Sequence, residues 1–154
     1  MSKINIFGKT EIIDPYYRYT MDKLNVVQNK NKIVINNLDK VANDLKLEKF
    51  IIIDSFKIYL GCNIILDKNN ITITSNKLSY DNFYNTLRDL IEYLVLCPTC
   101  FKPETKLEVE NKNINMTCAC CNFTGKIIDH KKVIPKQIIK LMENIVKKHY
   151  NNKK

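Results

Sequence analysis

Five of the six cysteines in this chain fall between positions 97 and 121, and their spacing constrains the fold more than any other feature. Cys97, Cys100, Cys118 and Cys121 form the pattern C-x₂-C, 17 residues, C-x₂-C. Each C-x₂-C turn directs two sulfurs to one centre, and two facing turns make a tetrahedral thiolate cage for Zn²⁺. Because four thiolates leave no open coordination position, we expect one structural zinc ion and not a catalytic one.

The segment between the two cysteine pairs has the pattern of a β-hairpin. Residues 107–110 and 114–117 alternate apolar with polar side chains and are joined by a polar turn at 111–113. A third strand is expected over residues 126–129, after Gly125. The sequence therefore predicts a zinc ribbon.

The other interpretations of these cysteines are a pair of disulfides or inert buried thiols. The N-terminus lacks the apolar stretch of a secretory signal, so we expect a reducing compartment, where disulfides are rare. Cys120 lies inside the second turn and is expected to point away from the metal. Cys62 is distant in sequence and is expected to pack as a small apolar side chain.

The charge of the chain favours an anionic partner, nucleic acid before a membrane surface. The sequence has 25 Lys and Arg against 16 Asp and Glu, a net charge of +9. It also has 20 Asn, 23 Lys and only two Arg, which is typical of AT-rich coding sequence, so codon bias supplies part of this charge. No apolar run reaches the roughly 18 residues of a membrane span, and we expect a cytoplasmic protein.

The chain shows none of the common catalytic patterns. With three glycines and no G-x-x-x-x-G-K-[ST] loop, it is not expected to bind GTP through a P-loop. It has no Ser/His/Asp, Cys/His or paired-carboxylate spacing that would make an active site. We therefore expect that the protein is not itself an enzyme.

The fold class predicted is α+β: a small α/β core domain, a C4 zinc ribbon and a C-terminal helix. We expect a flexible N-terminal tail over residues 1–20, the core over 21–94, the ribbon over 95–130, and the C-terminal helix with a basic tail over 131–154. Strand patterns occur at Lys32–Ile35 and, as a hairpin, at residues 63–66 and 71–74.

Helix signals separate these strands. Asn37 can cap a helix and Ser79 a longer one, while a last helix follows Pro135 and is expected to fray from residue 147 onward. Residues 50–53 suit either a strand or a helix, with Asp54 as a possible cap for a turn that ends at Gly61. The three helices have apolar faces formed by Leu38, Val41, Ala42 and Leu45; by Phe83, Leu87, Leu90, Ile91 and Leu94; and by Ile138, Leu141, Met142 and Ile145.

Three stretches together resemble the N-terminal domain of eukaryotic translation initiation factor five. Residues 17–24, with Tyr17-Arg18-Tyr19, resemble its tail-to-core junction. Residues 95–105, with Cys97-Pro98-Thr99-Cys100 and then Pro103-Glu104-Thr105, resemble the start of its ribbon, and residues 121–132 resemble the end. The beta subunit of initiation factor two is the sister family, which shares the core and the ribbon.

This resemblance implies a function in translation initiation. A protein of the factor-five type would stimulate GTP hydrolysis by the GTPase subunit of initiation factor two in trans, with Arg18 as an arginine finger. It would also contact initiator tRNA and the RNA of the small ribosomal subunit as a monomer. The residues that the resemblance and the charge nominate for nucleic-acid contact are Lys30, Lys32, Lys57, Lys131 and Lys132.

The chain departs from the factor-five pattern in two ways. The basic loop at residues 28–32 is short and lacks glycine, although Lys30 and Lys32 keep its charge. The 154 residues also leave no room for the C-terminal helical-repeat domain of factor five, so we expect its recruiting role to be missing or supplied otherwise.

Blander interpretations compete with each of these roles. Arg18 could be a surface arginine stacked between Tyr17 and Tyr19, and Arg88 a solvated helix residue. His130 lies beside the ribbon and is expected to be structural, since four cysteines already close the metal site. Two other functions stay open: a non-activating scaffold like the beta subunit of factor two, and a nucleic-acid-binding zinc ribbon of the transcription type.

Overall fold

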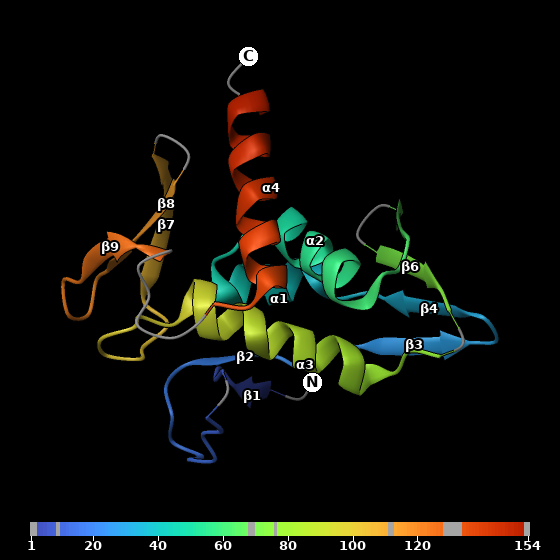
Figure 1. Ribbon diagram of the computed structural model, residues 1–154. Helices are drawn as coiled ribbons and strands as arrows, with labels where there is room; N and C mark the ends of the chain where they lie inside the picture. Colours follow the sequence, from blue (N-terminus) through green and yellow to red (C-terminus); the bar gives the residue numbers. More distant parts are fainter. Residues whose placement is uncertain are drawn as a thin grey trace.

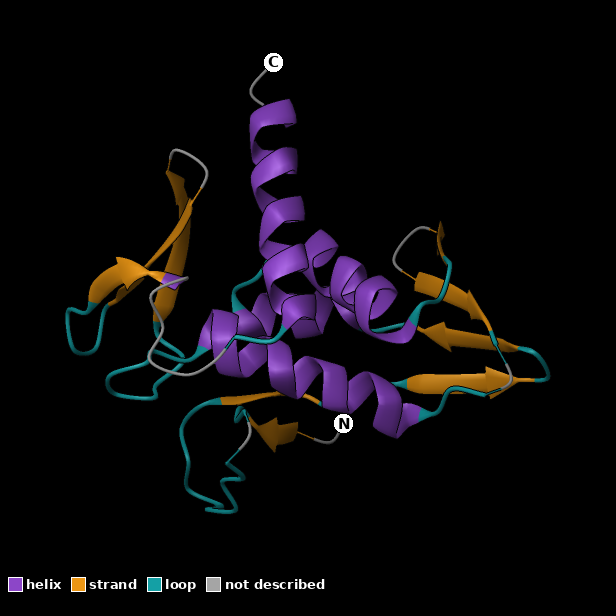
Figure 2. Cartoon of the chain, viewed as in Figure 1, coloured by secondary structure: helices purple, strands orange, loops and turns teal. Residues whose placement is uncertain are grey.

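The computed structural model describes residues 3–8, 10–67, 70–75, 77–110, 113–127 and 134–152. Its helices gather at the centre, with a four-stranded sheet on one side and a three-stranded ribbon on the other (Figures 1 and 2). In chain order the elements are β1 (Lys3–Asn5), β2 (Thr20–Asp22), β3 (Val26–Asn29), β4 (Lys32–Ile35), α1 (Leu38–Leu45), α2 (Lys49–Leu60), β5 (Ile64–Asp67), β6 (Asn70–Thr74), α3 (Tyr80–Leu90), the π-helical turn η1 (Ile91–Val95), β7 (Thr105–Glu110), β8 (Asn113–Cys118), β9 (Thr124–Lys126) and α4 (Lys136–Asn152). The predicted α+β class is confirmed.

The four-stranded sheet is antiparallel throughout, in the order β3-β4-β6-β5. Alternation along the two central strands buries one face completely, through Ile33 and Ile35 of β4 and Ile71 and Ile73 of β6. These side chains share one apolar core with the helices. The predicted strand at Lys32–Ile35 and the predicted β5–β6 hairpin are both confirmed.

The helical faces predicted from periodicity are buried as expected, but two predicted caps are wrong. Asn37 stands at the cap position of α1, yet its side chain bonds the backbone of the preceding segment: Oδ1 accepts from the Asn25 N–H and Nδ2 donates to the Lys23 carbonyl. Residues 50–53 are helical, so Asp54 lies inside α2 and not at its start. Gly61 does end α2, with a φ of 59° that favours glycine.

Ser79 begins α3 as predicted, with its backbone N–H donated to Asn82 Oδ1 at 2.8 Å. The helix continues without interruption into η1, whose Leu94 and Val95 are buried, and then delivers the chain to Cys97. The C-terminal end of this long helix therefore fixes where the ribbon starts.

The N-terminal segment differs from the flexible tail expected over residues 1–20. Strand β1 pairs antiparallel with β2, and the following Ile6 and Phe7 are buried. Arg88 of α3 holds this segment, because its Nε donates to the Gly8 carbonyl at 3.1 Å and its guanidinium lies 5.0 Å from the centre of the Phe7 ring. Arg88 is thus an anchor between two segments 80 positions apart, and not a solvated helix residue.

The ribbon is an antiparallel sheet in the order β7-β8-β9, which confirms the predicted hairpin. Its third strand lies at Thr124–Lys126, earlier than the predicted residues 126–129, of which 128 and 129 lie outside the described residues.

Helix α4 packs against α2 and continues to Asn152, past the point where fraying was expected. Its Lys148 pairs with the buried Asp54 of α2, with Nζ and Oδ2 3.1 Å apart. The C-terminal basic segment is therefore tied to the core at this position.

Candidate functional site

Two loops of the same backbone geometry carry the four predicted metal ligands. In the first loop, the Phe101 N–H donates to the Cys97 carbonyl and the Cys97 N–H donates to the Lys102 carbonyl. The second loop repeats these bonds one for one, from Asn122 to Cys118 and from Cys118 to Phe123.

A positive φ closes each loop: 60° at Phe101 and 63° at Asn122, the fourth residue after the first cysteine in each case. Asparagine tolerates this conformation, but phenylalanine rarely adopts it, so the first loop is held there by its surroundings. The sequence pattern predicted the cysteine positions and gave no sign of this backbone conformation.

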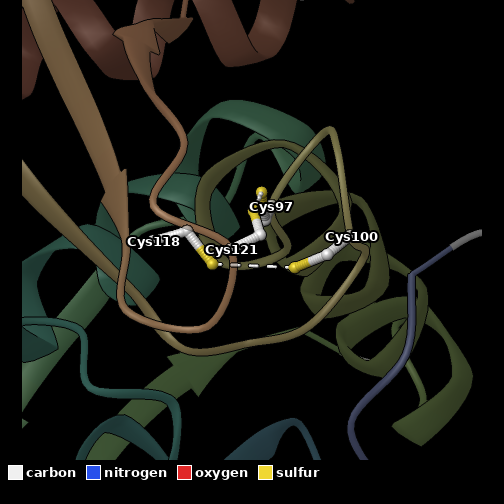
Figure 3. Close-up of side chains that lie close together, drawn as sticks. All are labelled: Cys97, Cys100, Cys118 and Cys121. Carbon is white, nitrogen blue, oxygen red and sulfur yellow. Dashed lines mark hydrogen bonds between the residues drawn. The ribbon is translucent and has the colours of Figure 1, made fainter.

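The two loops face each other and bring the four sulfurs together (Figure 3). All four Sγ atoms lie within 4.8 Å of one another, with Cys97 to Cys121 and Cys100 to Cys118 both at 3.6 Å. A tetrahedral site with metal–sulfur bonds of about 2.3 Å requires sulfurs about 3.8 Å apart, whereas a disulfide requires about 2.05 Å. The arrangement fits a metal cage and does not fit disulfides.

The electrostatics of the cage favour a thiolate at Cys97. Burial of this side chain disfavours the charged form, but hydrogen bonds to the sulfur, including one from the Thr99 N–H at 3.4 Å, outweigh it and lower the pKa of Cys97. Cys120 is exposed and is not part of the cluster, as predicted. Cys62 packs beside the core, also as predicted, and burial raises the pKa of its thiol.

Arg18 lies on the surface, immediately before β2, and its segment is placed against the ribbon. Its side chain is 77% exposed, with Nη2 3.6 Å from Glu104 Oε1 and the guanidinium 5.0 Å from the centre of the Tyr19 ring. Tyr17 packs edge-on to Tyr19, and Lys102 of the first cysteine loop lies over the Tyr17 ring. Residues 17–19 therefore form one contiguous surface with residues 102–104 of the ribbon, a long-range contact that the sequence did not indicate.

The predicted nucleic-acid contacts are only partly brought together. Lys30 and Lys32 are exposed neighbours at the β3–β4 turn, at the opposite end of the molecule from the ribbon (Figure 1). Lys57 is exposed on α2, a separate element. Lys131, Lys132 and His130 lie outside the described residues.

Fold and site together define a class: an antiparallel α+β domain whose last core helix leads into a four-cysteine ribbon with a metal-binding geometry. Residues 9–124 match the model of a family described as a domain found in initiation factors 2B and 5. The chain belongs to this family, which unites initiation factor five with the beta subunit of initiation factor two.

Individual relatives agree with the family match. Eukaryotic translation initiation factor 5 of Caenorhabditis elegans is 32% identical over 126 residues, covering 78% of this chain and 29% of that protein. The probable factor 5 of Schizosaccharomyces pombe is 30% identical over 148 residues, covering 91% and 36%. Translation initiation factor 2 subunit beta of Nanoarchaeum equitans is 30% identical over 99 residues, covering 64% and 70%.

The chain spans about a third of the length of the factor 5 relatives it matches. The resemblance to factor five and its sister family is thereby confirmed, and membership supports a translation initiation factor. No helix in the described part of the chain has the length and apolar character needed to cross a membrane.

Proposed function

We propose that this chain is a GTPase-activating initiation factor, which supplies Arg18 to the GTPase subunit of initiation factor two during start-codon selection. It acts in trans and is not an enzyme itself. This function would place it in the cytoplasm.

The observation that carries this proposal is the contrast between the two arginines of the chain. Arg88 is held between the Gly8 carbonyl and the Phe7 ring, so its guanidinium is committed to the fold. Arg18 has a 77% exposed side chain on a surface segment and can reach a neighbouring protein. Of the two guanidinium groups, only that of Arg18 is available to a partner.

The chemistry of GTP hydrolysis explains why an exposed guanidinium is useful. Negative charge spreads over the transferred phosphoryl group in the transition state, and an arginine from a partner stabilises it, with an effect of about 10³ to 10⁵ on rate. Arginine suits this task better than lysine, because it is always charged and presents a planar fork of donors.

Single-turnover GTP hydrolysis by initiation factor two, assembled with initiator tRNA and the small subunit, tests this role. We expect Arg18→Ala to abolish most of the stimulation while binding to the complex and the free energy of unfolding stay near wild type. Arg18→Lys should restore only part of the rate. The control Lys126→Ala, which removes an exposed charge from the ribbon, should stimulate hydrolysis like the wild type. Full stimulation by Arg18→Ala would reject the finger.

We propose zinc as the metal of the four-cysteine cage, because a tetrahedral set of four thiolates is the usual structural zinc site. Cys97, Cys100, Cys118 and Cys121 would hold it, and the bound ion would fold the ribbon and supply no reaction chemistry. Metal analysis should find one zinc per chain, lost in Cys118→Ala and retained in Cys120→Ala, the matched control. Wild-type zinc content in Cys118→Ala would contradict this assignment.

We also propose that Lys30 and Lys32 contact phosphates of initiator tRNA or ribosomal RNA, with Lys57, Lys131 and Lys132 as further candidates. Such contacts release counterions, so binding to the preinitiation complex should weaken steeply with added salt. The Lys30→Gln, Lys32→Gln double variant should bind more weakly and with a shallower salt slope, whereas Lys106→Gln on the ribbon should not. Equal salt slopes for the double variant and the wild type would rule out the β3–β4 turn.

A non-activating scaffold, like the beta subunit of factor two, is the second candidate function. The match to the Nanoarchaeum equitans beta subunit favours it, since the shared region covers 70% of that protein. A scaffold would copurify with the GTPase subunit while Arg18→Ala left hydrolysis unchanged. The family match favours either of these functions over a zinc ribbon of the transcription type.

A further inference from the structure

The ion pair between Arg18 and Glu104 joins the N-terminal segment to the ribbon across a long stretch of sequence. Arg18 Nη2 lies 3.6 Å from Glu104 Oε1, and the guanidinium lies 5.0 Å from the centre of the Tyr19 ring. We propose that Glu104 is a positioning residue that parks Arg18 on the ribbon until a phosphate group competes for the guanidinium. This inference rests on the proposed function of Arg18.

The two partners differ in how firmly they are held. Glu104 follows the buried Pro103, and its backbone carbonyl accepts the Ala119 N–H at 2.9 Å, which ties it to the second cysteine loop. Its side chain is 26% exposed, against 77% for Arg18. The carboxylate is therefore the fixed member of the pair and the guanidinium is the member that can leave.

The geometry makes the contact easy to break. One nitrogen faces one oxygen at 3.6 Å, which is longer than the paired bonds of about 2.7–2.9 Å in a bidentate arginine–carboxylate fork. An exposed ion pair of this kind shifts an equilibrium by no more than about fivefold. The phosphates of a bound nucleotide carry more charge than a single carboxylate and can displace it.

Arginine side-chain NMR tests the parked state directly, because the chain contains only two arginines. In protein labelled with ¹⁵N-arginine, the Nε–Hε spectrum should contain one signal for Arg18 and one for Arg88. The Arg88 signal is an internal reference, since its Nε–H is bonded to the Gly8 carbonyl.

We expect Glu104→Gln to move the Arg18 signal and leave the Arg88 signal in place. Glu108→Gln, which removes the ribbon carboxylate paired with Lys106, is the matched control and should move neither. Should Glu104→Gln disturb the fold, the Arg88 signal would report it, and salt titration of the wild type replaces the variant: salt should move the Arg18 signal alone. An Arg18 signal that responds to neither perturbation overturns the proposal.

Hydrolysis measurements test the release step. Because Glu104→Gln frees the guanidinium, its stimulation of GTP hydrolysis at low salt should exceed that of the wild type by up to about fivefold, and the difference should disappear at high salt. Stimulation equal to or below wild type at low salt would overturn the release step. If no form of the protein stimulates hydrolysis, the proposed function fails, and the NMR signals still decide whether Glu104 holds Arg18.

Discussion

Replacement of Arg88 by alanine tests whether the N-terminal segment is built into the fold. The substitution removes the Nε–H···O bond to the Gly8 carbonyl at 3.1 Å and the contacts of the guanidinium with Phe7 at 5.0 Å and Tyr84 at 5.9 Å. A hydrogen bond from a charged donor contributes about 1.5–3 kcal/mol, and a cation–π contact about 0.5–1 kcal/mol at a partly exposed site. Since these contributions overlap, we expect a loss of about 2–3 kcal/mol in the free energy of unfolding.

Part of that loss should appear as local opening of the β1–β2 pair. The Ile6 N–H donates to the Tyr19 carbonyl at 2.9 Å and the Ile6 side chain is buried, so this amide reports whether the segment is docked. Hydrogen exchange at Ile6 should accelerate in Arg88→Ala by more than exchange in the β4–β6 ladder does. Urea unfolding measures the global part.

Arg18→Ala is the matched control, because it removes the other arginine from an exposed site. It should cost no more than about 1 kcal/mol, the upper range for an exposed ion pair. If Arg88→Ala proved as mild as Arg18→Ala, and Ile6 exchanged at the wild-type rate, Arg88 would be the solvated helix residue that the sequence suggested.

Three further predictions concern single side chains. Lys148→Met leaves the Asp54 carboxylate buried without its 3.1 Å partner, so urea unfolding should show a loss of about 1–2 kcal/mol, discounted for the exposure of Lys148, and a second change, Asp54→Asn, should recover most of it. Burial, aided by the nearby Tyr84 and Asp81, raises the pKa of Tyr80 to about 12, so the stability present below pH 10 should fall as the pH rises toward 12, and Tyr80→Phe should flatten that fall in a series of thermal melts. Lys30 has a φ of 56°, so Lys30→Gly should raise the free energy of unfolding by roughly 1 kcal/mol, and a decrease would show that the turn is unstrained.

Periodicity and local spacing were sufficient where a structure depends on neighbours in sequence. The apolar face of α1 is buried at Leu38, Val41, Ala42 and Leu45 because the 3.6-residue repeat and the core face coincide. The ribbon hairpin and its four cysteines were predictable for the same reason, since a C-x₂-C turn sets its own geometry.

Predictions failed where a polar side chain had a choice of partners. Asn37 and Asp54 are both residues that favour helix caps, yet each bonds a segment brought close by the fold: Asn37 the backbone at Lys23 and Asn25, and Asp54 the ammonium of Lys148. Propensity ranks the possible partners of a side chain near in sequence, and it contains nothing about partners that lie far along the chain.

The sequence by itself thus determined the fold class, the ribbon and the identity of the metal ligands, because each follows from short-range spacing. Only the tertiary structure decided the fate of the two arginines. Nothing local distinguishes them, since both lie beside aromatic residues that a guanidinium can cover. Packing of the N-terminal segment against α3 commits Arg88 to the Gly8 carbonyl and leaves Arg18 exposed beside Glu104, because burial depends on which surfaces meet in three dimensions.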